Sequence, residues 1–311
     1  MQKAPVLVIT SQVVRGRVGA RACGFALERL GHPAWILPTI LLPYHPGHGR
    51  GTRIVAPAED FSALIEDLIG KPWLAELGGV ITGYLGHARQ AGAIARLILA
   101  LKAKNPGLLY CCDPVIGDEA GLYVPEETAV AIRDELLPLA DIITPNRHEF
   151  AWLTGGASQR AVKAEEAHLL DSNEMIVTCA RKLAPRLVAV TSAFAMMKNA
   201  QATLLYDRSA DAGYLAEHRS FDQVPNGPGD LFSGLLMARL LEGAAPERAL
   251  QLSTASVFEI IAQSVRRGAD ELCLIEEQAR LETPMAMVTL RRIGAPALTR
   301  KGMVAKPIPL Q

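Results

Sequence analysis

An aspartate in a glycine-rich turn is the side chain of this sequence best suited to chemistry. Residues 224–230 are Val-Pro-Asn-Gly-Pro-Gly-Asp, so Asp230 follows Gly227 and Gly229. Glycine permits backbone conformations that other residues rarely adopt, and successive N–H groups of such a turn can converge on one anion. A carboxylate beside that anion could take the proton of an attacking hydroxyl group. A turn that only caps a helix would use the same residue types, so this motif alone leaves both interpretations open.

A helix must follow the turn to hold it in place. Apolar residues recur at three- and four-residue spacing from Leu231 to Leu241, and Gly243 comes soon after them. This pattern predicts a buried helix at about 229–242 that ends at a glycine. The N-terminus of a helix carries about half a positive charge, which favours an anion such as phosphate at the turn.

Composition favours a protein that binds small molecules. The chain has 311 residues, of which 50% are hydrophobic, enough to bury a large core. Its 32 basic and 32 acidic residues cancel and aromatic residues make up only 5%, which argues against a nucleic-acid partner. No apolar stretch approaches about 18 residues, so we expect a cytoplasmic protein with no membrane span. The five cysteines lack CxxC spacing, which indicates buried, reduced thiols.

Strand-length and helix-length segments alternate along the chain. Strands are predicted at 5–10, 34–39, 79–83, 108–112, 139–144, 187–191 and 202–206. Helices are predicted at about 19–30, 59–70, 87–104, 125–137, 147–154, 163–183, 229–242 and 246–264. This order predicts an α/β fold in which a mainly parallel central sheet is flanked by helices on both faces. We expect a single domain at 1–293 and an irregular C-terminal tail at 294–311.

Polar residues follow the predicted strands, at the edge of the sheet where α/β proteins bind ligands. They are Ser11, Tyr84, Asp113, Asp118, Thr144, Glu149, Thr191 and Ser192. We expect all of them to face the same edge as Asp230.

Three acids at this edge could bind a metal ion. Asp113, Asp118 and Glu149 offer hard oxygen ligands, and Mg²⁺ typically binds one or two carboxylates together with phosphate oxygens and water. Their spacing is equally compatible with turn-capping or solvated acids. The chain has no GxxxxGK[ST] phosphate loop and no GxGxxG near its start, which leaves the 227–230 turn as the phosphate site. A carboxylate base, an anion site and acidic ligands together predict phosphoryl transfer.

A series of motifs in the same order resembles the pyridoxal kinase family, which has the ribokinase-like fold. The resemblance runs from about residue 5 to 265. The series comprises Ser11-Gln12-Val13-Val14, Gly83-Tyr84, Cys112-Asp113-Pro114-Val115, Gly117-Asp118, Tyr123-Val124-Pro125 and Asp141-Ile142-Ile143-Thr144-Pro145-Asn146.

The resemblance implies a role for each matching position. Asp230 would be the base that takes the proton of the 5′-hydroxyl of pyridoxal as that oxygen attacks the γ-phosphate of ATP. Gly227 and Gly229 would form the anion hole. Residues implied in vitamer binding are Ser11, Tyr84, His45, Pro46, Gly47 and Asp230. Residues implied in ATP binding are Asp113, Asp118, Thr144, Glu149, Thr191, Ser192, Gly227, Gly229 and Phe232, of which Asp113, Asp118 and Glu149 would also handle Mg²⁺.

The resemblance further implies ATP and Mg²⁺ as cofactors, a B6 vitamer as substrate and a homodimer. It leaves a monovalent cation open. The loop at 117–125 resembles a flap that closes over ATP.

Two positions depart from the family pattern. Pro228 has no N–H group, so the anion hole must use donors from its neighbours. The substrate loop commonly has the sequence NHTG in this family, whereas residues 44–48 are Tyr-His-Pro-Gly-His, which leaves the preferred vitamer open. The HxxH spacing of His45 and His48 is interpreted as polar surface rather than a metal site.

Two other functions remain possible at this point. A hydroxymethylpyrimidine kinase of the same fold would also use a glycine turn and a base aspartate, but its glycine- and alanine-rich N-terminal segment is absent. A catalytically silent binder of vitamers or nucleotides would have no need of Asp230.

Overall fold

The structure is a computed structural model that describes residues 3–155 and 170–293. The tail expected at 294–311 and the first part of the helix expected at 163–183 lie outside these residues. None of the helices within the described residues is long and apolar enough to cross a membrane.

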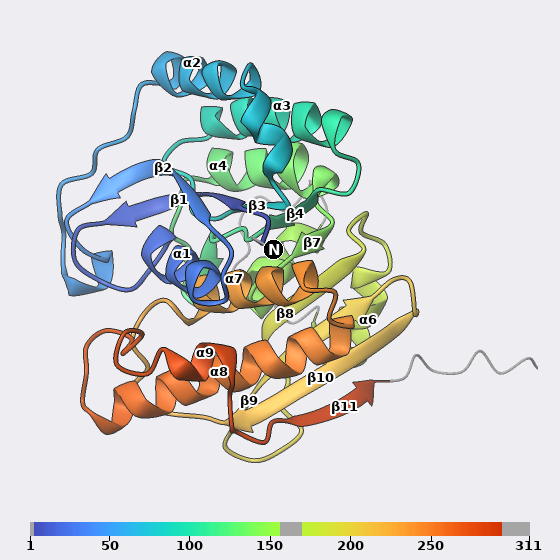
Figure 1. The fold of residues 1–311 in the computed structure, drawn as a ribbon. Helices are drawn as coiled ribbons and strands as arrows, with labels where there is room; N and C mark the ends of the chain where they lie inside the picture. Colours follow the sequence, from blue (N-terminus) through green and yellow to red (C-terminus); the bar gives the residue numbers. More distant parts are fainter. Residues whose placement is uncertain (1–2, 156–169, 294–311) are drawn as a thin grey trace, which may run out of the picture.

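One nine-stranded sheet forms the centre of the described chain (Figure 1). Its strands lie in the order β11-β10-β9-β8-β7-β4-β3-β1-β2. Their bounds are β1 Val6–Val13, β2 Ala34–Leu42, β3 Gly79–Thr82, β4 Leu109–Cys112, β7 Ile142–Ile143, β8 Leu187–Ala193, β9 Ala200–Asp207, β10 Ala212–Arg219 and β11 Thr289–Ile293. All pairings from β2 to β8 are parallel, and the three pairings from β8 to β11 are antiparallel. The prediction of a mainly parallel sheet is confirmed.

Helices cover both faces of the sheet, as predicted (Figure 1). On one face lie α2 Ala58–Ile69, α3 Arg89–Lys104, α4 Glu126–Ala131, α5 Arg147–Thr154 and α6 Asn173–Ala180. On the other lie α1 Ala20–Arg29, α7 Pro228–Leu241, α8 Pro246–Arg266 and α9 Ala279–Glu282. A separate two-stranded hairpin, β5 Gly117–Asp118 and β6 Gly121–Leu122, occupies the segment predicted as a flap.

The central strands are apolar throughout because both of their faces are buried. In β1, Val6 and Val8 pack under α1 and α7, whereas Leu7 and Ile9 pack under α2 and α3. Successive side chains of a strand point to opposite faces, so a covered parallel strand needs a continuous apolar run rather than an alternating one.

The strand predicted at 139–144 is shorter than expected. It is reduced to Ile142–Ile143, and a 3₁₀ turn at Leu137–Leu139 takes up the first residue expected in it. The other predicted strands are present at close to their expected bounds. Strands β10 and β11 were not predicted.

Candidate active site

A cleft of about 550 Å³ opens where the parallel strands end. The predicted site residues that line it are Ser11, His45, Pro46, Tyr84, Asp113, Asp118, Thr144, Glu149, Thr191, Gly227, Gly229 and Asp230. The structure therefore brings together most of the side chains that the sequence places after successive strands.

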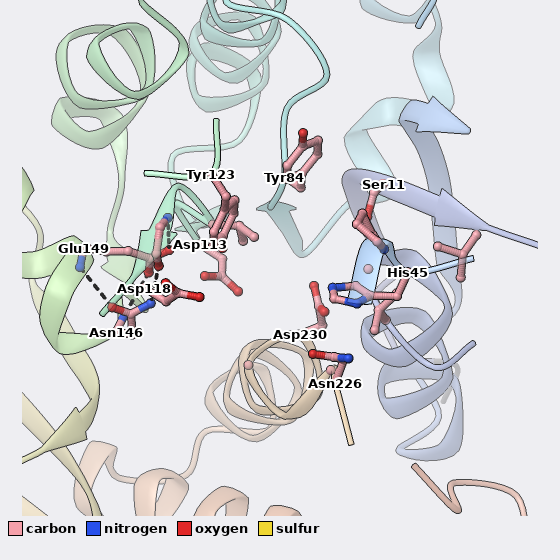
Figure 2. Close-up of a pocket in the computed structure, with 18 of the residues that line it drawn as sticks. Ser11, His45, Tyr84, Asp113, Asp118, Tyr123, Asn146, Glu149, Asn226 and Asp230 are labelled. Atoms are coloured by element: carbon pink, nitrogen blue, oxygen red, sulfur yellow. Dashed lines mark hydrogen bonds between the residues drawn. The ribbon is translucent and has the colours of Figure 1, made fainter. Parts of the chain in front are cut away.

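The cleft has two chemically different sides (Figure 2). Asp113, Asp118 and Glu149 are grouped on one side, where carboxyl groups dominate. Ser11 and His45 lie on the other side, and Asp230 lies close to His45.

Asp230 stands near the N-termini of two helices. It is the third residue of α7, and Gly19, the N-cap of α1, supplies a backbone hydrogen bond to its carboxylate. Burial raises the pKa of Asp230 to about 6, although the hydrogen bonds from the backbone of Gly19 and of Asp230 itself oppose that rise. The carboxylate is therefore ionised at neutral pH yet basic enough to accept a proton.

The two glycines of the turn differ in whether the structure requires glycine at their position. Gly227 has φ 105°, and a Cβ atom there would lie 2.1 Å from the carbonyl oxygen of Arg17, so only glycine fits. Gly229 lies within α7, is absent from the positive-φ glycines of the described chain and would place a Cβ in open space. Of the two glycines, Gly227 therefore uses a backbone conformation that other residues rarely adopt, and Gly229 does not.

Pro228 fits the turn as the first residue of α7. An N–H group at this position has no partner within the helix, so proline removes no helical hydrogen bond there. The N–H group of Gly229 remains as a donor at the helix N-terminus, whereas the N–H group of Asp230 already donates to the Asp230 carboxylate.

Asp113 is held by a chain of hydroxyl groups that the sequence did not reveal. Ser233 Oγ donates to Asp113 Oδ2 over 2.7 Å, and Thr144 Oγ1 lies 3.0 Å from Ser233 Oγ. Burial raises the pKa of Asp113 well above its ordinary value, and Glu149 and Asp230 raise it further. Ser233 comes three residues after Asp230, a spacing that puts both side chains on one side of the helix and could have identified it.

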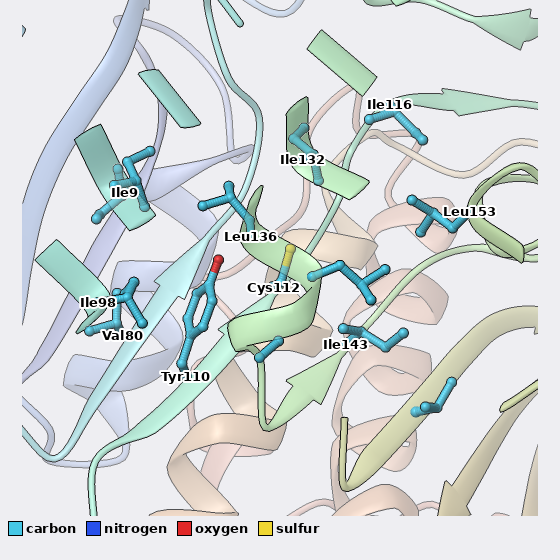
Figure 3. Packing of buried hydrophobic residues seen from close by; sticks show 14 of the residues in the cluster. Ile9, Val80, Ile98, Tyr110, Cys112, Ile116, Ile132, Leu136, Ile143 and Leu153 are labelled. Atoms are coloured by element: carbon cyan, nitrogen blue, oxygen red, sulfur yellow. The ribbon is translucent and has the colours of Figure 1, made fainter. Parts of the chain in front are cut away.

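Strand β4, which ends directly before Asp113, holds this residue in place. Tyr110 and Cys112 point into the core beneath α3, α4 and α5, in the apolar cluster that includes Leu136 and Ile143 (Figure 3). Cys111 points to the opposite face. Because the strand is anchored on both faces, the residue that follows it has little freedom to move.

Both carboxylate oxygens of Glu149 accept hydrogen bonds from backbone N–H groups. Its Oε1 accepts hydrogen bonds from the N–H groups of Ile116 at 2.8 Å and Gly117 at 3.3 Å, and its Oε2 accepts from Asn146 N–H at 2.8 Å. Burial raises its pKa to about 7 against those three hydrogen bonds. Glu149 therefore joins the start of α5 to the base of the flap hairpin.

Asp118 is the exposed acid of the group, and its Oδ1 accepts from the N–H of Ala120 at 2.8 Å. Within residues 3–155 and 170–293, no group of three His, Cys, Asp or Glu side chains is arranged to hold a metal ion. The metal-binding role of Asp113, Asp118 and Glu149 remains a prediction. A bound cation would favour the ionised forms of the crowded carboxyl groups.

The opposite side of the cleft offers hydrogen-bond donors and an aromatic ring. His45 Nδ1 accepts the N–H of Gly47 at 3.0 Å, so the neutral imidazole carries its proton on Nε2. Burial lowers the pKa of His45, which favours that neutral form. Arg53 donates to the hydroxyl of Tyr84 at 2.9 Å, and its guanidinium lies 5.9 Å from the centre of the ring. Arg53 also lines the cleft and was not predicted.

Three predicted residues are not among those lining the cleft. Gly47 lies against His45 and Asn226, and a Cβ atom on it would come within 2.9 Å of His45 Nδ1 and 3.1 Å of Asn226 Nδ2. Ser192 and Phe232 line an adjoining pocket of about 360 Å³, which shares Thr191 and Gly229 with the cleft. The two cavities thus meet at the start of α7.

Comparison with known proteins gives consistent results at the level of sequence and of fold. The family model described as phosphomethylpyrimidine kinase matches residues 76–273. The chain is 32% identical over 288 residues to pyridoxal kinase PdxY of Pseudomonas paraeruginosa, covering 91% of this chain and 97% of that protein. It is 33% identical over 292 residues to pyridoxal kinase PdxY of Pseudomonas putida, covering 91% and 96%.

Solved structures share the fold. Pyridoxal kinase from Entamoeba histolytica superposes with a TM-score of 0.82 at 21% identity, covering 94% of this chain and 100% of that one. Pyridoxal kinase from Leishmania donovani, in complex with ADP and pyridoxamine, gives a TM-score of 0.80 at 24% identity and the same coverage.

Proposed function

This chain belongs to the pyridoxal kinase family, and we propose that it transfers the γ-phosphate of ATP to the 5′-hydroxyl group of pyridoxal. The product would be pyridoxal 5′-phosphate, so the protein would act in vitamin B6 salvage. The observation that carries this proposal is the position of Asp230, between a donor-rich side of the cleft and an acidic side.

Asp230 would act as the general base. As the 5′-oxygen bonds to the γ-phosphorus, the hydroxyl proton passes to the carboxylate and the bond from phosphorus to the β-phosphate oxygen breaks, releasing ADP. The N–H group of Gly229 and the positive end of α7 would stabilise the charge on the transferring group. Ser11, Tyr84 and His45 would hold the vitamer on the donor-rich side.

The acidic side would handle the nucleotide. Mg²⁺ neutralises phosphate charge when it is bound, and the oxygens of Asp113 and Asp118 suit that cation. Ser233 already bonds Oδ2 of Asp113, which leaves Oδ1 as its candidate ligand atom. The adjoining pocket lined by Ser192 and Phe232 would take the rest of the nucleotide, with the 117–125 hairpin as the flap.

A second candidate is a hydroxymethylpyrimidine kinase, because the matching family model carries the description phosphomethylpyrimidine kinase. The sequence relatives favour pyridoxal. Purified protein should be supplied with ATP, Mg²⁺ and either pyridoxal or hydroxymethylpyrimidine, and each phosphorylated product measured. We expect product from pyridoxal, and product from hydroxymethylpyrimidine alone would establish the second candidate.

The same assay distinguishes an enzyme from a silent binder. A silent binder would bind pyridoxal and ATP, for example in calorimetry, and yield neither product. We further propose that the protein requires Mg²⁺ and is a cytoplasmic homodimer with one kinase domain at 1–293. The family resemblance supports these proposals and leaves the monovalent cation open.

A further inference from the structure

Glu271 joins segments that lie far apart in the sequence. They lie on the donor-rich side of the cleft, where the vitamer is proposed to bind and which we call the vitamer side. Its Oε1 accepts a hydrogen bond from Nε2 of His48 at 3.0 Å, and its Oε2 accepts one from the backbone N–H of Arg17 at 3.0 Å. The guanidinium of Arg15 lies 3.7 Å from Oε1. The side chain of Glu271 is only 16% exposed, so these contacts are partly shielded from water.

The backbone of Glu271 is a firm anchor. Ala269 N–H donates to the carbonyl oxygen of Ser264 at 3.0 Å, and Cys273 N–H donates to its hydroxyl at 2.9 Å. Leu272 and Leu274, on either side of Cys273, are buried in the core under α8. Because this segment is fixed, the carboxylate of Glu271 can restrict the motion of the residues that bind to it.

One partner is the substrate loop. His48 ends the 3₁₀ turn Pro46–His48, and His45, the N-cap residue before that turn, points toward Asp230 (Figure 2). The hydrogen bond from His48 to Glu271 therefore fixes the far end of the turn that presents His45 to the cleft. The loop is further joined to the body of the protein by the bridge between Leu41 and Ile54 at its base, by the hydrogen bond from Arg15 N–H to the carbonyl oxygen of Pro43 at 2.9 Å, and by the close approach of Gly47 to Asn226.

The other partner of Glu271 is the backbone of Arg17, which packs against the turn at Gly227. While the N–H of Arg17 bonds Glu271, its carbonyl oxygen packs against Gly227, where a Cβ would come within 2.1 Å. Gly16 has φ 123°, and a Cβ there would lie 3.1 Å from Glu271 Oε1, so the two segments are in close contact. A single carboxylate thus touches the supports of both the loop and the turn.

We propose that Glu271 is a positioning residue that holds the substrate loop, through His48, over the vitamer side of the cleft and against the Gly227 turn. The effect on vitamer binding rests on the proposed function. The contact between Glu271 and His48 does not depend on it. Loosening the loop lowers affinity for the vitamer, because His45 and Pro46 line its side of the cleft. Affinity for ATP stays unchanged, because the adjoining nucleotide pocket has no residue from 43–53 among those lining it.

The test uses His48→Ala and Glu271→Ala, with Asp270→Asn as the matched control. Asp270 is the neighbouring acid, its side chain is 61% exposed, and its ion pair is with Arg15 rather than with His48. Loss of a hydrogen bond of this kind predicts a rise in KM for pyridoxal of about 3- to 10-fold for His48→Ala, at unchanged KM for ATP. Limited trypsin digestion supplies a readout that needs no activity, since Arg50 and Arg53 lie in the loop.

We expect both alanine variants to be cut faster at Arg50 than the wild type, while Asp270→Asn is cut at the wild-type rate. Unchanged cleavage in His48→Ala, which removes the loop's partner of Glu271, would overturn the inference. Faster cleavage with unchanged KM for pyridoxal would overturn the role in vitamer binding. If the wild type makes no pyridoxal 5′-phosphate but the variants are still cut faster, the proposed function fails and the holding contact stands.

Discussion

Ser233 Oγ donates a hydrogen bond to Asp113 Oδ2 over 2.7 Å, and this contact ties the helix that carries Asp230 to the strand end that carries Asp113. The two residues are 120 positions apart in the chain. This buried hydroxyl group therefore adds a direct polar link between the helix of the candidate base and the candidate cation ligand, beside the apolar packing of α7 on the sheet.

Replacing Ser233 with alanine should destabilise the protein and slow catalysis. Asp113 Oδ2 and the hydroxyl of Thr144 would lose their shared partner, and such a loss costs about 1–3 kcal/mol of unfolding free energy. Urea unfolding and the turnover number measure the two effects. Ser253→Ala is the control, since Ser253 is equally buried and its hydroxyl has no partner within the described residues. Equal destabilisation by the two substitutions would contradict a specific role for Ser233.

Asp230→Asn should abolish most of the activity without unfolding the protein. Asparagine keeps the size of aspartate and can still accept a hydrogen bond from Gly19, but it cannot take a hydroxyl proton. Loss of a general base costs about 10²- to 10⁴-fold in turnover. Turnover and the thermal midpoint should be measured on one preparation, with binding of ATP as the check on folding. Near-normal turnover would reduce Asp230 to a helix-capping residue.

The rate should fall in acid because the base must be ionised. The pKa of Asp230 is raised to about 6, so its ionised fraction drops as the pH falls through that value. We expect kcat/KM for pyridoxal to decline below about pH 6 and to approach a tenfold loss per pH unit. The measurement is a profile from pH 5 to 8 at saturating ATP and Mg²⁺. A flat profile over that range would be inconsistent with Asp230 as the base.

Glu149 should make the protein less stable as the pH rises. Its pKa is about 7 when folded and 4.5 ordinarily, so between these values the folded state holds a proton that the unfolded state lacks. Its contribution to stability is present below pH 4.5 and is lost as the pH rises toward 7, at about 1 kcal/mol per pH unit.

Glu149→Gln removes that titration, so urea unfolding at pH 5 and pH 7.5 should show a smaller loss in the variant than in the wild type. The wild type and the variant share every other titrating group, which makes each the control for the other. A parallel pH dependence in the two proteins would show that Glu149 keeps its ordinary pKa.

Alanine substitutions at the two glycines of the turn should have opposite effects on stability. Gly227→Ala forces a side chain into a left-handed conformation and onto the carbonyl oxygen of Arg17, which costs on the order of 1–3 kcal/mol or more. Gly229→Ala finds open space within a helix and should be neutral or stabilising by about 0.4–1 kcal/mol. Urea unfolding of both variants decides the matter, and similar losses would mean that the turn is not strained at Gly227.

The sequence predicted the parallel part of the sheet well because those strands are continuous apolar runs between helices. It did not predict β10, in which Glu217 and His218 interrupt the apolar pattern. In the structure, buried Glu217 accepts hydrogen bonds from the backbone of Met196 and Met197 and from Arg291. Partners from two other segments offset the cost of burying that charge, and no local pattern can indicate them.

The site was predictable where its residues follow strands and unpredictable where it depends on contacts across the chain. Asp113 and Thr144 could be placed from strand ends alone. Ser233 could have been found by helix spacing from Asp230. Glu271 could not, because its importance comes from His48 and Arg17, which lie 223 and 254 residues away.

Beyond β8 the strands pair in antiparallel fashion, and residues of these strands line the adjoining pocket, whereas a loop bounds the vitamer side of the cleft. The amino-acid sequences of related proteins can therefore vary in different ways at the two cavities. Gln201 and Thr203 on β9 and His218 on β10 line the adjoining pocket from within paired strands. Inserting one residue there would turn every following side chain to the opposite face. The vitamer side is bounded by the 43–53 loop, which can lengthen or shorten at small entropic cost. Related proteins can therefore acquire new acceptors through insertions in that loop, whereas a new nucleotide preference requires substitutions at fixed strand positions.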